Sequence, residues 1–204
     1  MFYEPAKGHG LPHDPSKAIV APRPVGWIST LGADGTPNLA PYSFFNAFSS
    51  APFLVWFSSE GRKDSASHAS ETREFVANLA SRQLAEKMSR TGVDAPRGVS
   101  EFDFAGLTPA PCRLVAPPRV AEAPAALECK VTDIYEPTGL DGRHAGVFVV
   151  IGEVVGVHID DAYLTDDGRF DVVKAGNVAR LGYADYTSVE RTFAMRRPRW
   201  ADRA

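Results

Sequence analysis

Polar, aromatic and small residues are interleaved in the segment 28–49, ISTLGADGTPNLAPYSFFNAFS. Hydrogen-bonding side chains and aromatic rings are supplied by Asn38, Ser43, Phe44, Phe45 and Asn46. Ala40 and Pro41 leave room for a flat ligand to approach the main chain. A planar, polar heterocycle would fit such a surface. The alternative is an ordinary β-hairpin with a proline-interrupted edge, and composition alone favours that interpretation.

A second segment, 58–65 with the sequence SSEGRKDS, follows an apolar run and precedes a helix start. Arg62 and Lys63 supply positive charge, and Ser59 and Ser65 supply hydroxyl groups. The free amides at the start of the following helix add further donors, so the segment has the chemistry needed to hold a phosphate. The alternative is a charged, solvated turn, which composition alone favours.

These segments need a scaffold rich in strands and turns. The chain has 17 glycines and 16 prolines among 204 residues, which favours many turns over long helices. Strands are predicted where apolar, β-branched or alternating residues occur, at about 25–31, 36–44, 53–58, 74–80, 127–131 and 145–160. Six or seven strands at hairpin spacing, with few helices, predict a closed β-barrel.

Two short helices and one irregular connection complete the expected scaffold. The helices are predicted over about 65–72 and from Ser81 to just before Gly92. Residues between 92 and 111 mix glycine, proline and acids, which predicts an irregular loop packed by Phe102 and Phe104. Long ordered loops often border a site.

Composition excludes several classes of function. A net charge of −3 and a pI of about 6.0 provide no basic field for nucleic acid. The longest apolar run, 146–157, is shorter than the ~20 residues of a membrane-spanning helix, so no membrane partner is predicted. Residues 1–17 lack the pattern of a signal peptide, and we therefore expect a cytoplasmic protein.

Cysteine and histidine spacing indicates neither a disulfide nor a metal site. Cys112 and Cys129 lie in apolar contexts without CxxC spacing, which favours buried, reduced thiols. Metal-ligand spacing is absent among His9, His13, His144 and His158. No metal is predicted.

Several motifs occur together and in order along the chain. They are RPVGWIST (23–30), GTPNLAPYSFFN (35–46), RKDS (62–65), ET (71–72), EFVANL (74–79), IGEVV (151–155) and RLGY (180–183) followed by Tyr186. In this combination the chain closely resembles the flavin reductase-like, FMN-binding split-barrel family, in the branch that includes flavoredoxin. The resemblance extends over 20–198.

The resemblance implies a mainly β fold, a six-stranded antiparallel split barrel of Greek-key arrangement with a few short flanking helices. It places this domain at 18–190, between an N-terminal arm, 1–17, and a basic C-terminal tail, 191–204. It also implies a homodimer in which FMN binds non-covalently at the edge of the barrel, near the interface.

The resemblance further implies which residues hold FMN. The isoalloxazine would lie along Ser29, Thr30, Asn38, Leu39, Ala40, Ser43, Phe44, Phe45 and Asn46. The phosphate would lie near Arg62, Lys63, Asp64 and Ser65, with the hydroxyl of Ser59 close by. The chain departs from the family at His68, where Asn is frequent, and at Tyr183, where a second Gly is frequent.

The implied function is that of an NAD(P)H-dependent flavin reductase, in which hydride is transferred to flavin N5. Because the redox chemistry belongs to the cofactor, no acid/base pair is required. His158, Arg180 and Tyr186 are candidates for lining the reaction site, and each has a structural alternative. The expected partner is a flavin-dependent monooxygenase or another redox protein. Two alternatives stay open, an FMN electron carrier that ignores NAD(P)H and a flavin-free binding module.

Overall fold

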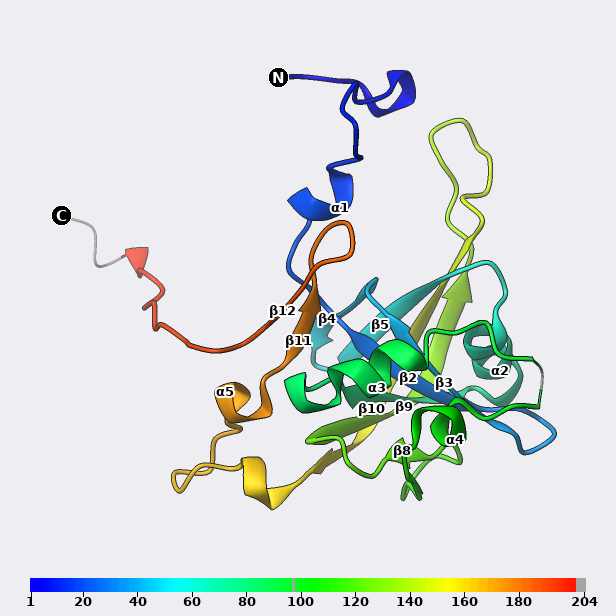
Figure 1. Cartoon of the computed structure of the whole chain (residues 1–204), viewed down its shortest axis with the longest axis vertical. Helices are drawn as coiled ribbons and strands as arrows, with labels where there is room; N and C mark the ends of the chain where they lie inside the picture. Colours follow the sequence, from blue (N-terminus) through cyan, green and yellow to red (C-terminus); the bar gives the residue numbers. More distant parts are fainter. Residues whose placement is uncertain (97, 201–204) are drawn as a thin grey trace.

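The computed structural model describes residues 1–96 and 98–200 and consists mainly of β-strands. Seven strands form one curled antiparallel sheet (Figure 1). In the order in which they pair, they are β3 (Pro37–Tyr42), β2 (Gly26–Leu31), β6 (Glu74–Leu79), β9 (Ala125–Tyr135), β10 (Val147–Ile159), β5 (Phe53–Glu60) and β4 (Phe45–Ser50). The hydrogen-bonded ladder ends at β3 on one side and at β4 on the other, so the barrel is split between these two strands.

The mainly β, split-barrel prediction is confirmed, with two differences. The sheet has seven strands rather than six, and its order is open rather than closed. The extra strand arises because the chain bends at Ser43 and Phe44, which separates β3 from β4. Most side chains of β4 are exposed, so no alternating apolar pattern marks it in the sequence.

Two small sheets and several short helices surround the main sheet. One small sheet contains β1 (Arg23–Pro24), β11 (Val178–Arg180) and β12 (Tyr186–Ser188), and the other contains β7 (Pro109–Ala110) and β8 (Arg119–Val120). The helices are η1 (Pro5–Lys7), α1 (Ser16–Ile19), α2 (Asp64–Thr72), η2 (Arg82–Leu84), α3 (Ala85–Arg90), α4 (Glu101–Ala105), η3 (Asp161–Tyr163) and α5 (Val172–Ala175).

Both predicted helices are confirmed, as α2 and as η2 continued by α3. The region 92–111 differs from its prediction, because it contains α4. Phe102 is buried as expected, but Phe104 is exposed and its ring lies under the guanidinium of Arg90, 5.0 Å from its centroid. On so short a helix only one of the two phenylalanines faces the core.

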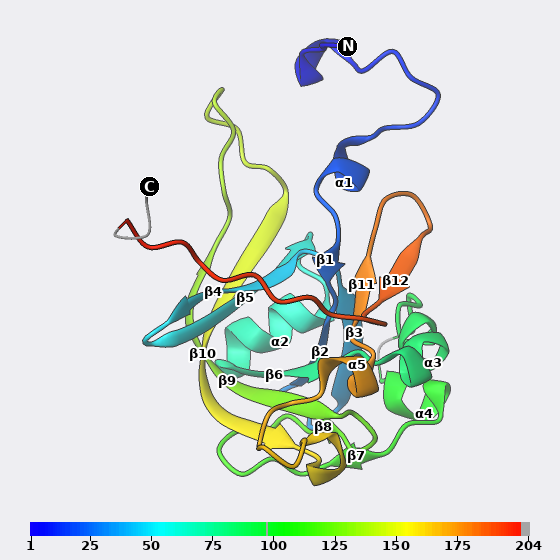
Figure 2. The same cartoon turned by 90° about the vertical axis from the view of Figure 1, so that its left-hand side faces the viewer.

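Helix α2 lies in the concave side of the curled sheet, as the second view shows (Figure 2). Its buried residues are Ser65, Ala66 and Ala69, whose short side chains let the helix approach the strands closely. The helix ends at Arg73, which has a left-handed backbone conformation and leads directly into β6. Its N-terminus is therefore fixed beside β3, where both predicted binding segments meet.

Strand β2 is buried on both faces, and its two polar side chains, Ser29 and Thr30, are hydrogen-bonded inside the protein. Trp27 packs with Leu39 and Phe102 on one side, whereas Ile28 faces the core that contains Phe57 on the other. Fully burying such side chains contributes about 1.5–3 kcal/mol each, so β2 is a rigid support for its neighbour β3.

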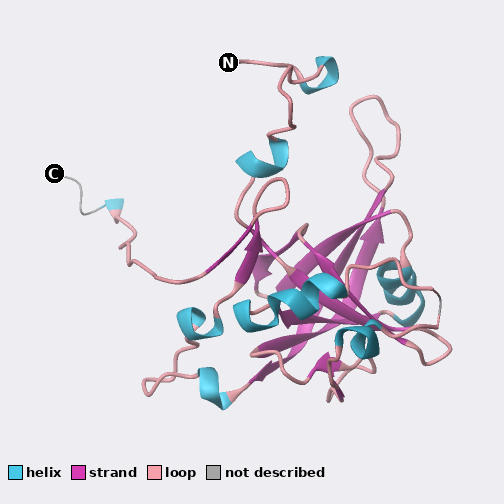
Figure 3. Ribbon diagram, in the orientation of Figure 1, coloured by secondary structure: helices cyan, strands magenta, loops and turns pink. Residues whose placement is uncertain are grey.

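Residues 1–15, residues 189–200 and the connection at 136–146 extend from this body mostly as loop (Figure 3). The division into arm, domain and tail stays a prediction, and residues 201–204 of the tail lie outside the described residues. Among the residues described, no helix has the length and apolar character needed to cross a membrane.

Candidate functional site

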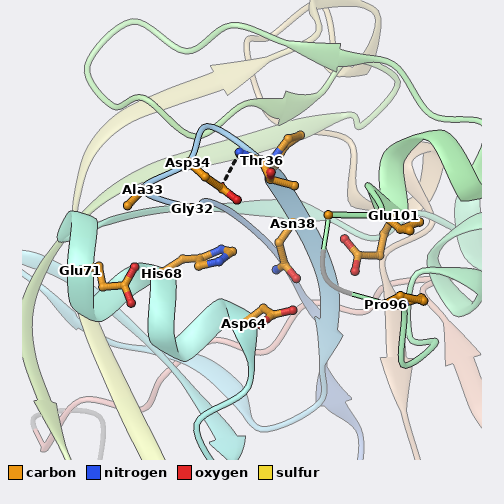
Figure 4. Close-up of a pocket in the computed structure, with 13 residues that line it drawn as sticks. Gly32, Ala33, Asp34, Thr36, Asn38, Asp64, His68, Glu71, Pro96 and Glu101 are labelled. Atoms are coloured by element: carbon orange, nitrogen blue, oxygen red, sulfur yellow. Dashed lines mark hydrogen bonds between the residues drawn. The ribbon is translucent and has the colours of Figure 1, made fainter.

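Two neighbouring cavities lie between β3, the start of α2 and α4. The first, which we call the β3–α2 cavity, has a volume of about 280 Å³ and is lined by Asn38, Ala40, Pro41, Tyr42, Lys63, Asp64, Ser65, Glu101 and the loop 91–95. The second, the acidic cavity, has a volume of about 230 Å³ and is lined by Gly32, Ala33, Asp34, Thr36, Pro37, Asn38, Asp64, His68, Glu71, Pro96, Gly98, Val99 and Glu101 (Figure 4). The cavities share Asn38, Asp64 and Glu101, so they adjoin one another.

The β3–α2 cavity brings together residues from both predicted binding segments. Asn38 and Ala40 come from β3, whereas Lys63, Asp64 and Ser65 come from the start of α2. Asn38 and Ser65 are 27 positions apart in the sequence, yet a hydrogen bond joins the two segments: Asn38 Nδ2 donates to Ser65 Oγ at 2.8 Å. The predicted proximity of the heterocycle and phosphate segments is therefore present in the fold.

Buried polar contacts hold the two walls of this cavity in register. Besides its bond to Ser65, Asn38 Nδ2 contacts Thr30 Oγ1 at 3.3 Å. Thr30 Oγ1 in turn lies 3.3 Å from His68 Nδ1 on α2. These side chains satisfy one another, so they position β3 against α2.

The start of α2 borders the β3–α2 cavity. Its capping residue is Lys63, which is in extended conformation and gives no side-chain cap, so no side chain of the cap accepts the first amides. The ammonium group of Lys63 lies 3.9 Å from a carboxylate oxygen of Asp94, and both side chains are largely exposed. Helix dipole, open amides and an adjacent cation together favour an anion at this point.

Arg62 and Lys63 are adjacent in the sequence, but their charged groups lie at different places in the structure. Lys63 lines the β3–α2 cavity, whereas the guanidinium of Arg62 lies over the ring of Phe148 on β10, 4.9 Å from its centroid. A cation–π contact at an exposed site contributes about 0.5–1 kcal/mol. Lys63 is therefore the cation closer to the predicted phosphate position.

Glu101 is a buried carboxyl group that the sequence does not reveal as a site residue. It begins α4, and its carboxylate faces Asn38 across the cavity (Figure 4). Burial raises the pKa of Glu101 and the charge of Asp64 adds to this, although the hydrogen bond from the N–H of Leu39 opposes the shift. Glu101 is recognised as a site residue only from its contact with Leu39, which is 62 positions away in the sequence.

The open edge of β3 offers acceptors rather than donors. Pro37 and Pro41 have no N–H, and the N–H of Leu39 donates to Glu101 Oε2 at 3.0 Å. Amides alternate in direction along a strand, so those of Asn38 and Ala40 point toward β2. The carbonyl oxygens on the open side can therefore accept hydrogen bonds from a ligand.

Three predicted binding residues point away from the cavities. Ser29 is buried, and its hydroxyl donates to the carbonyl of Pro118 at 2.6 Å. Leu39 has its side chain in the core, and Ser59 donates to the carbonyl of Gly61 at 3.0 Å. These side chains contact the interior of the protein and not the cavities.

Ser43, Phe44, Phe45 and Asn46 line a separate cavity of about 330 Å³ between β4 and β1, together with Ile19, Val20, Ala21, Pro22, Arg23, Pro24 and Trp56. The ammonium of Lys17 and the guanidinium of Arg23 each lie 5.8 Å from the centroid of the Phe44 ring. Arg23 is buried and donates to three backbone carbonyl groups, including that of Val20 at 2.7 Å. This wall is therefore rigid and basic.

The three residues considered for the reaction lie elsewhere. Arg180 donates to the carbonyl of Tyr183 at 2.5 Å and lies over the ring of Tyr186, so these residues brace the small sheet that contains β11 and β12. His158 contacts Glu128. None of them lines the three cavities described above.

Neither cysteine has the properties of a reactive thiol. Cys129 is buried in β9 and Cys112 is half-buried, and neither forms a disulfide. Burial, with a smaller effect of the charge on Glu128, raises the pKa of Cys112 to about 11. A thiol with this pKa is protonated near neutral pH.

Comparison with known proteins gives one consistent result. Residues 20–174 match the family model of the flavin reductase like domain. An uncharacterized protein of Aquifex aeolicus is 36% identical over 169 residues, which cover 80% of this chain and 83% of that protein.

Solved structures agree with that match. Nitrilotriacetate monooxygenase component B from Bacillus cereus is similar with a TM-score of 0.86 and 26% identity, over 96% of this chain and 98% of that one. Flavoredoxin of Desulfovibrio vulgaris is similar with a TM-score of 0.76 and 25% identity, over 85% of this chain and 90% of that one. The family match covers most of the chain, and the split barrel agrees with it: the protein belongs to the flavin reductase-like family.

Proposed function

We propose that this protein binds FMN in the β3–α2 cavity and reduces it with NAD(P)H, as a flavin reductase. The observation that carries the proposal is the junction of Lys63, the uncapped start of α2 and the open edge of β3 in one cavity. Membership of the flavin reductase-like family supports it.

The residues present fit the phosphate of FMN. Lys63 and the open amides of α2 attract a dianion, and the hydroxyl of Ser65 lies beside them. Asp64 and Glu101 line the same cavity and repel it. The phosphate therefore belongs on the Lys63 side, away from Glu101.

The remaining part of the β3–α2 cavity fits a flat ring system. Ala40 and Pro41 have small side chains, and a Cβ on Gly92 would stand 3.5 Å from Pro41 Cγ and 3.3 Å from the carbonyl oxygen of Ser89. A side chain at position 92 would thus narrow the slot beside β3. The carbonyls on the open edge of β3 suit the imide N–H of an isoalloxazine.

FMN, when bound, supplies the hydride and electron chemistry of such a site. The protein contributes binding and electrostatics: Lys63 balances phosphate charge, and the Asn38–Ser65 hydrogen bond fixes the two walls. Burial raises the pKa of Tyr42, so its phenol stays neutral beside the ligand.

Two further features belong to this proposal. Phe44, Phe48 and Phe53 are exposed near β4, which suits a homodimer interface.

The partner proposed for reduced flavin is a flavin-dependent monooxygenase, because the structurally similar protein from Bacillus cereus is component B of nitrilotriacetate monooxygenase. The similarity to flavoredoxin supports the second candidate, an FMN electron carrier that does not oxidise NAD(P)H.

The visible absorbance spectrum of the purified protein, recorded anaerobically before and after NADH or NADPH, separates these functions. A flavin reductase is yellow and bleaches with a pyridine nucleotide. An electron carrier is yellow, ignores both nucleotides and bleaches only with a protein donor or dithionite. Protein that stays colourless after incubation with FMN contradicts both.

A further inference from the structure

Cys112, Glu128 and His158 meet at one point of the fold, although they come from three separate segments. The sulfur of Cys112, a carboxylate oxygen of Glu128 and a ring nitrogen of His158 all lie within 4.8 Å of one another. Thiolate, carboxylate and imidazole are the three ligand types that zinc prefers in proteins.

Strands β9 and β10 place two of the three side chains. Glu128 pairs with Gly156, and Ala126 pairs with His158, so Glu128 and His158 are diagonal neighbours on one face of the sheet. Gly156 makes room for the carboxylate, since a Cβ there would stand 3.2 Å from Glu128 Cδ. Cys112 comes from the loop that follows β7 and crosses this face.

The carboxylate of Glu128 is held rigidly before any ion is added. It is almost fully buried and accepts backbone N–H groups from Arg113 at 2.9 Å, Leu114 at 2.6 Å and Val115 at 3.1 Å. Hydrogen bonds of this kind orient a metal ligand.

We propose that Cys112, Glu128 and His158 bind a zinc ion, with water in the fourth position. Zinc–ligand bonds of about 2.0–2.3 Å place tetrahedral ligand atoms about 3.3–3.7 Å apart. The three atoms are already within 4.8 Å, whereas His158 Nε2 and Glu128 Oε1 are now 2.5 Å apart and must separate. His158 is partly exposed, so its ring can move outward to admit the ion.

Charge balance favours the same ion. On binding, the thiol of Cys112 forms a sulfur–zinc bond and its proton passes to solvent. Thiolate and carboxylate then neutralise the two positive charges of zinc. A soft sulfur ligand also disfavours Mg²⁺ and Ca²⁺, which take oxygen ligands.

The plainer interpretation is a hydrogen-bonded pair of Glu128 and His158 beside an uninvolved thiol. The chain contains a pair of that kind for comparison: His144 Nδ1 lies 3.5 Å from Glu136 Oε2, with the histidine exposed. No cysteine joins that pair in the described part of the chain. His144 therefore supplies a matched control for a histidine and carboxylate without sulfur.

The test is the zinc content and zinc coordination of the protein that comprises residues 1–204. The protein is stripped with a chelator, mixed with an equal amount of ZnCl₂ and freed of unbound metal. We expect about one zinc per chain, with one sulfur at about 2.3 Å and nitrogen or oxygen at about 2.0–2.2 Å in zinc X-ray absorption. Bound zinc should also raise the thermal midpoint, because it binds only the folded chain.

Cys112→Ala and His158→Gln should each weaken zinc binding by at least about tenfold, whereas His144→Gln should leave it unchanged. Circular dichroism checks that the variants fold. The X-ray absorption of the unaltered protein keeps the test independent of them. Unaltered protein without bound zinc, a zinc shell without sulfur, or undiminished binding in folded Cys112→Ala would overturn the proposal.

Discussion

The carboxylate of Glu101 accepts the backbone N–H of Leu39 at 3.0 Å, so a side chain from α4 occupies the one donor on the open edge of β3. The neighbouring positions on that edge are Pro37 and Pro41, which have none. The edge is thereby protected against pairing with another strand, and its carbonyl oxygens face the proposed flavin site.

Replacing Glu101 by glutamine should tighten FMN binding. Glutamine still accepts the N–H of Leu39 but carries no charge against the phosphate. Removing a like charge from the wall of the same cavity contributes up to about 1 kcal/mol, or roughly fivefold in affinity. Quenching of flavin fluorescence by the flavin-free protein measures the change. Glu71→Gln, which alters an exposed carboxylate of the acidic cavity, is the control and should have a smaller effect.

The same substitution should change how stability depends on pH. Burial raises the pKa of Glu101 in the folded protein above its ordinary value of 4.5. Its favourable contribution is thus complete below pH 4.5 and is lost as the pH rises through the folded pKa. The free energy of unfolding of Glu101→Gln, minus that of the unaltered protein, should therefore increase with pH over this window. Urea unfolding of flavin-free protein at several pH values tests this, and a difference that decreases with pH would contradict it.

Lys63→Ala should weaken FMN binding by about tenfold, because an exposed charge-assisted contact contributes at the lower end of 1.5–3 kcal/mol. Arg62→Ala should weaken it much less, since that guanidinium lies over Phe148. The double variant should lose its flavin during purification while keeping its circular dichroism spectrum. Equal effects of the two single changes would contradict this assignment of the phosphate site.

Thr91→Val should destabilise the fold by about 1–3 kcal/mol. The indole Nε1 of Trp27 donates to Thr91 Oγ1 at 2.8 Å, and both residues are buried, so valine leaves the indole N–H without a partner. Thr91 also begins the loop that lines the β3–α2 cavity. Urea unfolding measures the loss. The double variant Trp27→Phe, Thr91→Val should lose less free energy of unfolding than the two single variants lose in sum, because it no longer contains the unpaired indole N–H.

Local patterns in the sequence predict most of this fold. The β-branched and aromatic residues around Trp27 and the polar start of α2 at Asp64 and Ser65 each identify an element, because strand and helix signals act over a few residues. The order of motifs then predicts the family, and with it that the segment of β3 lies close to the start of α2. Strand β4 escapes prediction because its exposed side chains lack a pattern.

Contacts between distant residues are what the sequence does not reveal. Glu101 reaches Leu39 across 62 positions, and Cys112, Glu128 and His158 converge from a loop and two strands. No local spacing encodes either arrangement. The separation of Arg62 from Lys63 likewise depends on where β10 places Phe148.

The most direct test of the account is the crystal structure of the protein with FMN. We predict the flavin ring in the β3–α2 cavity beside Ala40 and Pro41, with its phosphate at Lys63 and the start of α2. Clear density for FMN elsewhere, with this cavity empty at saturating FMN, would contradict the central claim.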